Sequence, residues 1–377
     1  MTPSELAREA VRRLRRRVRG LYLQDGEVGW GVPLPRPPAL RGPGAVKGFR
    51  VGIIGAGLQG LRQCQGIRAV KGIDIAGLAD INPARLKRTA DLIELPEHKR
   101  FCDAEKMLRE AGPLDLACVA TTTPSHVELG RMALKWGAKR VLLEKPMDNS
   151  LDRARSFNRE CEAAKITLAI NYSRRWMLDY SAIKRCIGKG YVGNPRSIAI
   201  IVGRGELAMH GSHYFDLCRF LLDSEPAWVL SHLDRITEVN ARGAEFQDPS
   251  GFCLFGFRNG ARAFIDFSSD LKVKDPCVTI KGDSGRITVD EPRQSWSLQT
   301  QGQRVWKYPF AESMKSSTLF ARVVADILSD RPVAAGAKEG IAALEMIIGA
   351  HLSNQRDNQT VKFPLSEDES SLEILFP

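Results

Sequence analysis

Two kinds of apolar pattern follow one another along the chain. Between residues 48 and 170, short uninterrupted apolar runs alternate with stretches in which apolar residues recur every three or four positions. Uninterrupted runs are typical of strands buried on both faces of a parallel sheet, and the longer spacing is typical of amphipathic helices. The alternation predicts a doubly wound parallel sheet with right-handed crossovers. Strands are expected at 50–54, 73–78, 114–120, 140–144 and 166–170, with helices at 58–71, 83–93, 103–111, 125–136 and 151–164.

After residue 171 the spacing of apolar residues changes to every second position, above all within 227–310. That period is typical of strands that bury one face, and turns such as Arg258-Asn259-Gly260 favour hairpins. A large, mostly antiparallel open sheet is therefore expected. Its strands are predicted at 195–203, 228–233, 251–257, 261–267, 277–281, 286–289, 295–300 and 304–308, with helices at 179–188, 211–222, 313–330 and 337–353.

The start of the chain carries much of its charge. The formal net charge is +11, and residues 1–20 hold seven arginines against two glutamates, so five of these charges lie there. Apolar residues recur among them at helical spacing, which predicts a basic amphipathic helix. Five prolines within 31–47 predict an extended segment after it. The helix could pack on the protein or a second copy, bind nucleic acid or an anionic membrane, or act as a targeting segment. It is the only candidate for nucleic-acid or membrane binding.

Composition narrows the class of protein. No apolar run approaches the ~20 residues that a membrane-spanning helix needs. The eight cysteines form no C-x-x-C pair, which is typical of a reducing compartment. An apolar core typical of a secretory signal does not follow Met1. A cytoplasmic protein is expected.

A glycine-rich motif follows the first strand directly. It reads Gly55-Ala56-Gly57-Leu58-Gln59-Gly60, and Asp80 follows at the end of the second apolar run. The first glycine permits a tight turn, the second lets the backbone approach a pyrophosphate, and the third allows close packing of helix on strand. Amides at the start of the helix, from Leu58 and Gln59, then face the anion. The motif predicts a dinucleotide-binding domain.

The carboxylate of Asp80 favours NAD over NADP, because it can accept hydrogen bonds from ribose hydroxyls and repels a 2′-phosphate. Arg85, Lys87 and Arg88 lie just beyond it and could face such a phosphate if the loop turned back. Three segments follow: a basic helix and proline-rich extension over 1–47, a Rossmann domain over 48–170, and an α+β domain for substrate binding and oligomerisation over 171–377.

Two further motifs carry a resemblance. Leu143-Glu144-Lys145-Pro146 ends the fourth strand, and Gly-Ser-His-Tyr-Phe-Asp occupies 211–216. Together with the glycine motif, they make residues 48–365 resemble the glucose-fructose oxidoreductase and inositol dehydrogenase family, Gfo/Idh/MocA. The resemblance implies an NAD(P)-dependent oxidoreductase that transfers a hydride between nicotinamide and a secondary hydroxyl or keto group of a sugar, sugar nucleotide or cyclitol.

The resemblance also implies residue roles. Lys145 is expected to contact the nicotinamide ribose and the reacting hydroxyl, with a cis peptide bond before Pro146, and His213 is expected to bind the substrate. Alternatively, His213 is a structural residue that caps the helix or lies in the core, with its ring held by Asp216. The implied cofactor contacts are Glu144 at the ribose, Thr121, Thr122, Pro124 and His126 after the third strand, and Asn171 and Arg175 at the entry to the second domain.

One position departs from the family pattern. An aspartate commonly lies four residues before the histidine, and this chain has Met209 there. His210 is the nearest candidate to complete the proton relay. No third ligand accompanies His210 and His213, so no metal is expected.

Additional substrate contacts are expected from the segment after the fifth strand, where Tyr172 and Arg174 lie, and from the loop with Arg204. One of the two arginines at 174 and 175 is expected to be an exposed surface residue.

Two alternatives to this function remain at the sequence level. The fold could serve a non-sugar carbonyl substrate or a redox-neutral reaction with retained NAD, or it could be a dinucleotide sensor that binds nucleic acid through its basic helix. The leading interpretation implies a small-molecule substrate, a sugar or sugar derivative.

A homodimer or homotetramer is expected through the C-terminal sheet, because the helices at 179–188, 211–222 and 313–330 can cover only one of its faces. The large apolar residues that suggest this are Trp228, Phe252, Phe255, Phe264 and Trp296.

Overall fold

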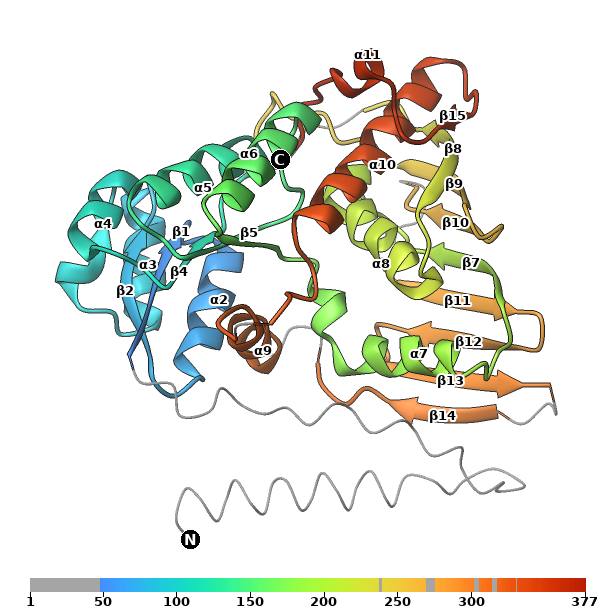
Figure 1. The fold of residues 1–377 in the computed structure, drawn as a ribbon, viewed down its shortest axis with the longest axis horizontal. Coiled ribbons are helices and arrows are strands. Elements are labelled where there is room, and N and C mark those ends of the chain that lie inside the picture. Colours follow the sequence, from blue (N-terminus) through green and yellow to red (C-terminus); the bar gives the residue numbers. More distant parts are fainter. Residues whose placement is uncertain (1–47, 237–238, 269–274, 302–304, 314–316, 330) are drawn as a thin grey trace, which may run out of the picture.

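The computed structural model describes residues 48–377 except 237–238, 269–274, 302–304, 314–316 and 330. The predicted basic helix and the proline-rich segment therefore lie outside the described residues. Two sheets organise the described part of the chain, and helices lie between and around them (Figure 1). No helix within this part is both long enough and apolar enough to cross a membrane.

The first sheet is the predicted parallel one. Its strand order, β3-β2-β1-β4-β5-β6, reverses direction between β1 and β4, which creates the crevice where Rossmann folds bind nucleotides. All of its strand pairs are parallel. The short edge strand β3 was not predicted, because two residues carry no periodic signal. The strands are β1 (Phe49–Ile54), β2 (Ile73–Ala79), β3 (Arg100–Phe101), β4 (Leu116–Val119), β5 (Arg140–Leu143) and β6 (Thr167–Ile170).

Helices cover both faces of this sheet, and several begin where the sequence supplies a cap. The side chains of Asn82, Asp103 and Ser150 each accept a hydrogen bond from a backbone N–H three residues on, at Arg85, Lys106 and Arg153 respectively. Such caps satisfy donors that a helix start leaves unpaired. The helices are α2 (Leu58–Arg68), α3 (Pro83–Leu92), α4 (Ala104–Ala111), α5 (His126–Lys135) and α6 (Leu151–Ala163).

The second sheet is mostly antiparallel, as predicted. Its order is β14-β13-β12-β11-β7-β10-β9-β8-β15, and β7 with β10 is the parallel pair. The edge strand β15 was not predicted. The strands are β7 (Pro195–Ile201), β8 (Pro226–Leu233), β9 (Gly251–Phe257), β10 (Arg262–Asp266), β11 (Cys277–Gly282), β12 (Gly285–Asp290), β13 (Ser295–Thr300), β14 (Val305–Pro309) and β15 (Val361–Lys362).

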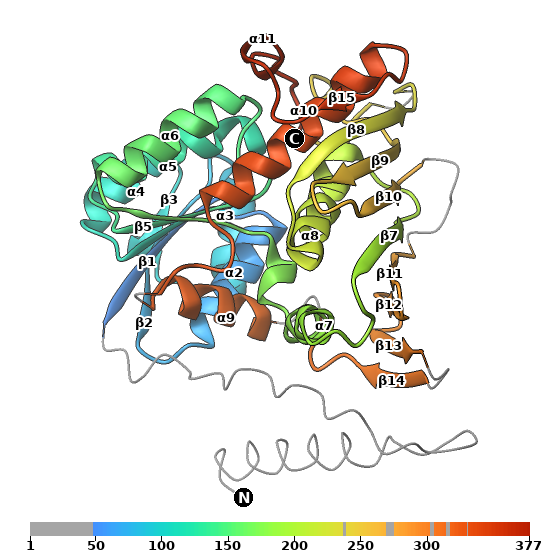
Figure 2. The same cartoon turned by 45° about the vertical axis from the view of Figure 1, so that its right-hand side comes forward.

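One face of this sheet is covered by α7 (Leu178–Gly188), α8 (Ser212–Leu222) and α10 (Ala337–Gln355) (Figure 2). The expectation that the helix near 313–330 also covers it is wrong. Helix α9 (Ser317–Ile327) instead packs on α2 of the first domain, where a Cβ at Gly66 would lie 2.4 Å from the Cβ of Phe320. The late part of the chain thus returns to the Rossmann domain.

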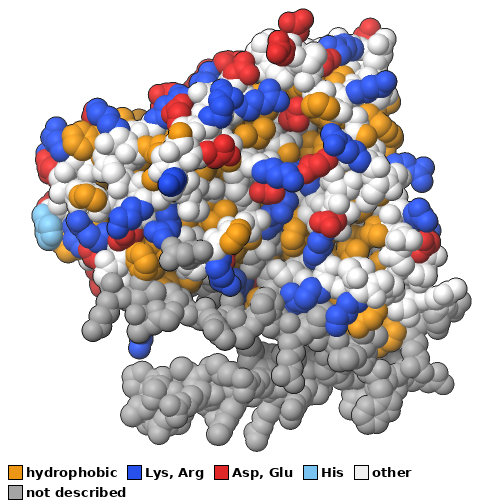
Figure 3. Space-filling model, viewed as in Figure 1, with side chains coloured by type: hydrophobic (Ala, Val, Ile, Leu, Met, Phe, Trp, Pro, Cys, Tyr) orange, Lys and Arg blue, Asp and Glu red, His pale blue; other side chains and the backbone are white. Residues whose placement is uncertain are grey.

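Basic and acidic side chains lie interspersed over the face shown in Figure 3. That face of the described residues therefore carries no large patch of a single charge sign.

Candidate active site

The glycine motif forms the turn that its spacing predicts. Gly55 has a φ of +103° and packs so closely on β4 that a Cβ would lie 2.4 Å from the carbonyl oxygen of Ala120. A Cβ at Gly60 would lie 1.8 Å from the carbonyl oxygen of Gly55. A Cβ at Gly57 would meet nothing within 4 Å, so this glycine faces open space at the start of α2. That space suits a pyrophosphate, because helix N-termini attract anions.

Asp80 ends β2 beside this turn and is buried. Its carboxylate accepts hydrogen bonds from the backbone N–H groups of Ala56 and Asn82, both at 2.8 Å. Arg85 lies 3.6 Å from the same carboxylate, and Lys87 pairs with Asp91. Arg85 is thus turned toward an acid, which favours a ribose diol over a 2′-phosphate at this edge.

A buried polar cluster lies under the carboxyl end of β5. One carboxylate oxygen of Glu144 accepts hydrogen bonds from the side-chain amides of Gln63 at 2.8 Å and Asn171 at 2.7 Å. Burial raises the pKa of Glu144. The amide oxygens of Gln63 and Asn171 are buried and have no partner among the described residues, so acceptors remain for a ligand. Gln63 was not predicted, although a polar residue three positions after Gly60 was a usable signal.

Lys145 follows Glu144, and the predicted cis bond to Pro146 is confirmed. The lysine is 5% exposed. Its Nζ donates a hydrogen bond across the domain boundary to the carbonyl oxygen of Met209 at 3.1 Å, and it lies 3.8 Å from the sulfur of the same residue. The residue in the place of the family aspartate therefore still contacts Lys145, through its backbone and its sulfur.

His126 is buried between two backbone segments, and the cofactor contact expected of it stays a prediction. It is 1% exposed, and its ring nitrogens lie 2.8 Å from the carbonyl oxygen of Pro146 and 3.2 Å from that of Thr121. Burial lowers its pKa to about 4. The ring thus ties the segment after β4 to the segment after β5. In this segment Thr122 is exposed and Pro124 is half-buried, and a cofactor contact for them and for Thr121 stays a prediction.

The last residues of the chain, 374–377, also contact these loops, which the sequence did not indicate. Asn149 donates from its side-chain amide to the carbonyl oxygens of Ile374 and Phe376, at 2.7 and 3.1 Å. The hydroxyl of Thr123 donates to the carbonyl oxygen of Pro377 at 2.7 Å. Phe376 is fully buried. These contacts fix the loops of the Rossmann domain that face the second domain.

The second domain meets Lys145 with a single turn of π-helix, Leu207–Gly211, directly before α8. The carboxylate of Asp248 accepts hydrogen bonds from the backbone N–H groups of Ala208 at 2.7 Å and Met209 at 3.0 Å. Burial raises the pKa of Asp248 to about 7. Asp248 is thus separated from Lys145 by the single residue Met209, and sequence reasoning missed it because it lies 39 positions further on.

A cavity of about 440 Å³ opens beside this turn. Met209, His210 and Asp248 line it, with Arg204 and Arg242. The imidazole Nδ1 of His210 faces the carboxylate of Glu206 and lies 3.1 Å from the backbone N–H of the same residue. The predicted residues Arg204 and His210 thus line the same cavity as Met209, the residue that Lys145 contacts.

His213 lies in the first turn of α8, and its ring contacts the edge of the Tyr172 ring, with centroids 6.2 Å apart. Tyr172 is 1% exposed, and burial raises the pKa of its hydroxyl. Asp216, the residue that the structural alternative would place on the His213 ring, pairs with Arg175 and Arg219.

Both arginines of the segment after β6 have structural partners. Arg174 is buried, and its guanidinium forms two 2.8 Å bonds to Glu291. Arg175 forms two 2.8 Å bonds to Asp216. The expectation of an exposed arginine here is wrong. The ion pair of Arg175 holds this segment to α8, and the ligand contacts expected of Arg174 and Arg175 stay predictions.

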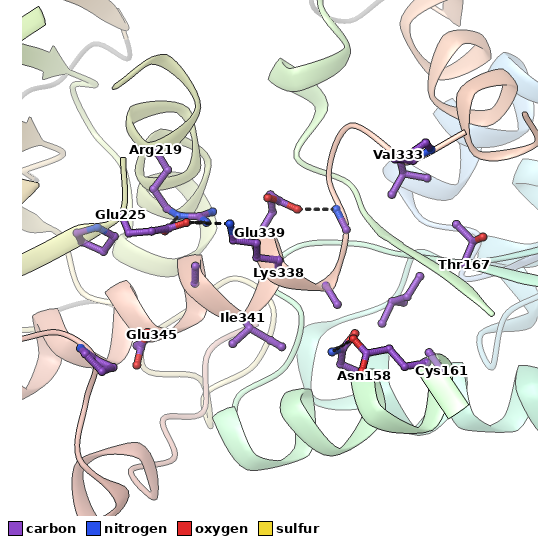
Figure 4. A pocket seen from close by; sticks show the side chains of 18 of the residues that line it. Asn158, Cys161, Thr167, Arg219, Glu225, Val333, Lys338, Glu339, Ile341 and Glu345 are labelled. Atoms are coloured by element: carbon purple, nitrogen blue, oxygen red, sulfur yellow. Dashed lines mark hydrogen bonds and ion pairs between the residues drawn. The ribbon is translucent and has the colours of Figure 1, made fainter. Parts of the chain in front are cut away.

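A larger cavity, of about 1200 Å³, lies between α6 and α10 (Figure 4). It touches β6 at Ile166–Leu168, the amino end of that strand, whereas nucleotides bind at carboxyl ends. Its charges are paired: Glu225 lies 2.7 Å from Arg219 and 3.3 Å from Lys338. This cavity is therefore separate from the glycine motif and Lys145.

Models of one family match both domains. Residues 49–172 match the Gfo/Idh/MocA oxidoreductase family with an NAD-binding Rossmann fold, and residues 194–288 match the Gfo/Idh/MocA C-terminal domain. The chain is 28% identical to D-apiose dehydrogenase of Rhizobium rhizogenes over 66% of this chain and 75% of that protein. It is 23% identical to myo-inositol 2-dehydrogenase of Thermotoga maritima over 78% of this chain and 93% of that protein.

The fold is also that of a crystal structure of an oxidoreductase from Agrobacterium radiobacter in complex with NAD⁺, L-tartaric acid and magnesium. The TM-score is 0.71 at 22% identity, over 83% of this chain and 98% of that one. The family match over residues 49–172 includes three features of the site. They are the open glycine turn, the acid that follows β2, and the buried lysine at the carboxyl edge of the sheet. The chain is an NAD-binding oxidoreductase and belongs to the Gfo/Idh/MocA family.

Proposed function

We propose that the protein interconverts a secondary hydroxyl and a keto group on a sugar, sugar derivative or cyclitol. The observation that carries the proposal is the position of Lys145. This buried lysine belongs to the Rossmann domain, and its Nζ donates a hydrogen bond to Met209 of the second domain, which lines the 440 Å³ cavity. A substrate in that cavity would contact Met209, the residue that Lys145 touches. The named dehydrogenases among the relatives, for D-apiose and myo-inositol, support this substrate class.

NAD would be held by residues of the Rossmann domain. The start of α2 suits the pyrophosphate and Asp80 suits the adenosine ribose, while the unpaired amide oxygens of Gln63 and Asn171 offer acceptors near Glu144. Bound NAD⁺ supplies the hydride acceptor, so that an alcohol becomes a ketone, NAD⁺ becomes NADH and the hydroxyl proton leaves to a base.

The residues of the chain must then hold the hydroxyl and accept its proton. Lys145 holds the oxygen of the reacting group, and His213 or His210 accepts the proton, because a neutral imidazole nitrogen can act as a general base. Asp248 holds the Met209 backbone, and with it the carbonyl oxygen that orients Lys145. Asp248 would thus position Lys145, a task that the family aspartate, replaced here by Met209, would otherwise share.

A different reaction on the same fold is the second candidate, because Met209 interrupts the family's relay. A non-sugar carbonyl substrate, or a redox-neutral reaction with retained NAD, would fit the same cofactor site. The test is a panel of free sugars, nucleotide sugars, cyclitols and simple ketones, with NADH followed by its absorbance. NADH formation from a polyol supports the proposal, whereas conversion of substrate without net change in NADH supports the second candidate.

We also propose that two copies of the chain pair through the open face of the second sheet. Trp228, Phe252 and Phe264 lie on that face and are partly exposed, and the rings of His232, Phe252 and Phe264 form a row with 5.8 Å spacings. Phe255 and Trp296 do not belong to it, because they point inward and are 0% and 3% exposed. Within the described residues, helices cover the other face, so a second copy would bury this one.

A further inference from the structure

The cavity beside Lys145 carries more basic than acidic side chains. Arg204, Arg235 and Arg242 line it, against two acidic side chains, Glu206 and Asp248, and the last residue, Pro377. Such an imbalance in a partly enclosed site raises the local concentration of anions. The partners of each charge decide whether it is available to a ligand.

Both acids face other groups. Glu206 faces the imidazole of His210, and Asp248 accepts from the backbone N–H groups of Ala208 and Met209. Burial raises the pKa of Asp248 to about 7, so its charge is only partly developed at neutral pH. Neither carboxylate forms an ion pair with Arg235 or Arg242 within the described residues.

Arg242 lies closest to the chemistry. Its guanidinium nitrogen is 2.9 Å from the sulfur of Met209, and the Nζ of Lys145 is 3.8 Å from the same sulfur. The Arg242 side chain is exposed and lines the cavity, whereas Lys145 is buried and lies behind Met209, outside the lining. One methionine side chain therefore separates a guanidinium without a carboxylate partner among the described residues from the amine that would hold the reacting hydroxyl.

We propose that the substrate is a polyol that carries an acidic group, a carboxylate or a phosphate, and that Arg242 binds this group while Lys145 holds the hydroxyl. The planar fork of an arginine binds either anion with two parallel hydrogen bonds. The short separation places the acidic group within a few carbons of the reacting carbon. The group is unchanged by the reaction. This inference rests on the proposed function.

The phosphates of the cofactor do not account for Arg242. The pyrophosphate position at the start of α2 belongs to the Rossmann domain, while Arg242 belongs to the second domain and faces Met209. Loss of the Arg242 charge should therefore weaken binding of the acidic substrate and leave NAD affinity unchanged. That difference separates the two roles experimentally.

The test uses the full chain with NAD and pairs of compounds that differ only in the acid. Gluconate is compared with sorbitol and glucuronate with glucose, and glucose 6-phosphate gives the phosphate arm. Binding is read from thermal stabilisation of the NAD-bound protein, and turnover from NADH formation. The acidic member of a pair should bind and react at least about tenfold better, since a charged group paired with arginine contributes that much or more.

Variants assign the effect to one residue. Arg242→Gln should remove the preference for the acid, Arg242→Lys should keep part of it, and NAD affinity should be unchanged in both. Arg258→Gln is the matched control, because this arginine is exposed in the turn after β9 and does not line the cavity. Stabilisation by gluconate or glucuronate assigns the carboxylate, and stabilisation by glucose 6-phosphate alone assigns the phosphate.

A preference for the neutral member of each pair, or an acid preference unchanged in Arg242→Gln, overturns the acidic substrate and leaves the dehydrogenase intact. Failure of every polyol, acidic or neutral, to yield NADH with a protein that binds NAD overturns the proposed function and this inference with it.

Discussion

Asp80 performs two tasks at one carboxylate. It holds the glycine turn through the N–H of Ala56, and it is the acid placed to select a ribose diol. Removing it therefore also loosens the turn that binds both cofactors. Asp80→Ala should weaken NAD and NADP binding together, and NAD by more, so that the preference between them flattens.

Titration of both cofactors by intrinsic fluorescence measures this. Asp80→Asn is the companion variant, because its amide oxygen keeps one acceptor for the turn without the charge. A wild-type protein that already prefers NADP would contradict the assignment of Asp80.

The carboxyl group of Asp248 makes folding depend on pH in a defined direction. Burial, with a smaller effect of Glu206, raises its pKa from 3.8 to about 7, although the N–H groups of Ala208 and Met209 and the charge of Lys145 oppose the rise. The folded protein thus keeps a proton that the unfolded chain releases at lower pH. Between these values the group makes folding less favourable as pH rises, and the effect is constant above them.

Asp248→Asn cannot ionise, so the stability of this variant relative to wild type should rise with pH by on the order of 1 kcal/mol per pH unit across that window. Urea unfolding at pH 5, 6, 7 and 8 measures it. Asp283→Asn is the control, since that exposed carboxyl has a lowered pKa and is ionised throughout this range. Parallel curves for wild type and Asp248→Asn would contradict the raised pKa.

Among the elements, the segment after β6 is held by buried charges rather than by apolar packing alone. Arg174 lies bidentate on Glu291, which also accepts hydrogen bonds from the hydroxyls of Tyr180 and Tyr214. This network joins α7, α8 and the turn after β12. Breaking one buried ion pair leaves the other charge uncompensated.

Glu291→Gln should therefore lower the free energy of unfolding by roughly 3–5 kcal/mol. Arg293→Gln in the same turn removes a pair with Asp290 whose arginine is 76% exposed, and it should cost about 1 kcal/mol or less. Thermal unfolding of both variants measures the difference. Equal shifts in Tm would show that the network contributes no more than a surface pair.

The periodic elements were predictable from the sequence because burial imposes a period. The parallel strands and their helices, the antiparallel strands and the glycine turn appear within a few residues of their expected bounds. The two-residue strands β3 and β15 carry no period. The position of α9 on α2 was not predictable either, because an amphipathic pattern shows that a face is buried and does not show its partner.

The same distinction applies to the site. The motif residues Gly55, Asp80 and Lys145 were recognisable because the chemistry needs them at fixed spacing. The partners Gln63 and Asp248 come from other elements, and tertiary contacts alone bring them in. The exposed arginine expected at 174 or 175 was wrong for the same reason: the acids that pair with them lie 117 and 41 positions away.

At the scale of the whole molecule, the open sheet face predicts association. The mass in solution should be at least twice the chain mass of 41.8 kDa at micromolar concentration, as measured by light scattering. Phe252→Glu should reduce it by placing a charge on the face, whereas Leu92→Glu, on the exposed surface of α3, should not. A wild-type mass of one chain would refute pairing through the sheet.

The central expectation is that Lys145 is needed for hydride transfer and contributes little to NAD binding. The most direct measurement compares Lys145→Ala with the control Lys139→Ala, an exposed lysine of the same domain, in NAD titration and in NADH formation from a substrate of the wild type. Lys145→Ala should bind NAD within about tenfold of wild type and turn over at least ~10²-fold more slowly, while the control is unchanged. Turnover at the wild-type rate in Lys145→Ala would contradict the account.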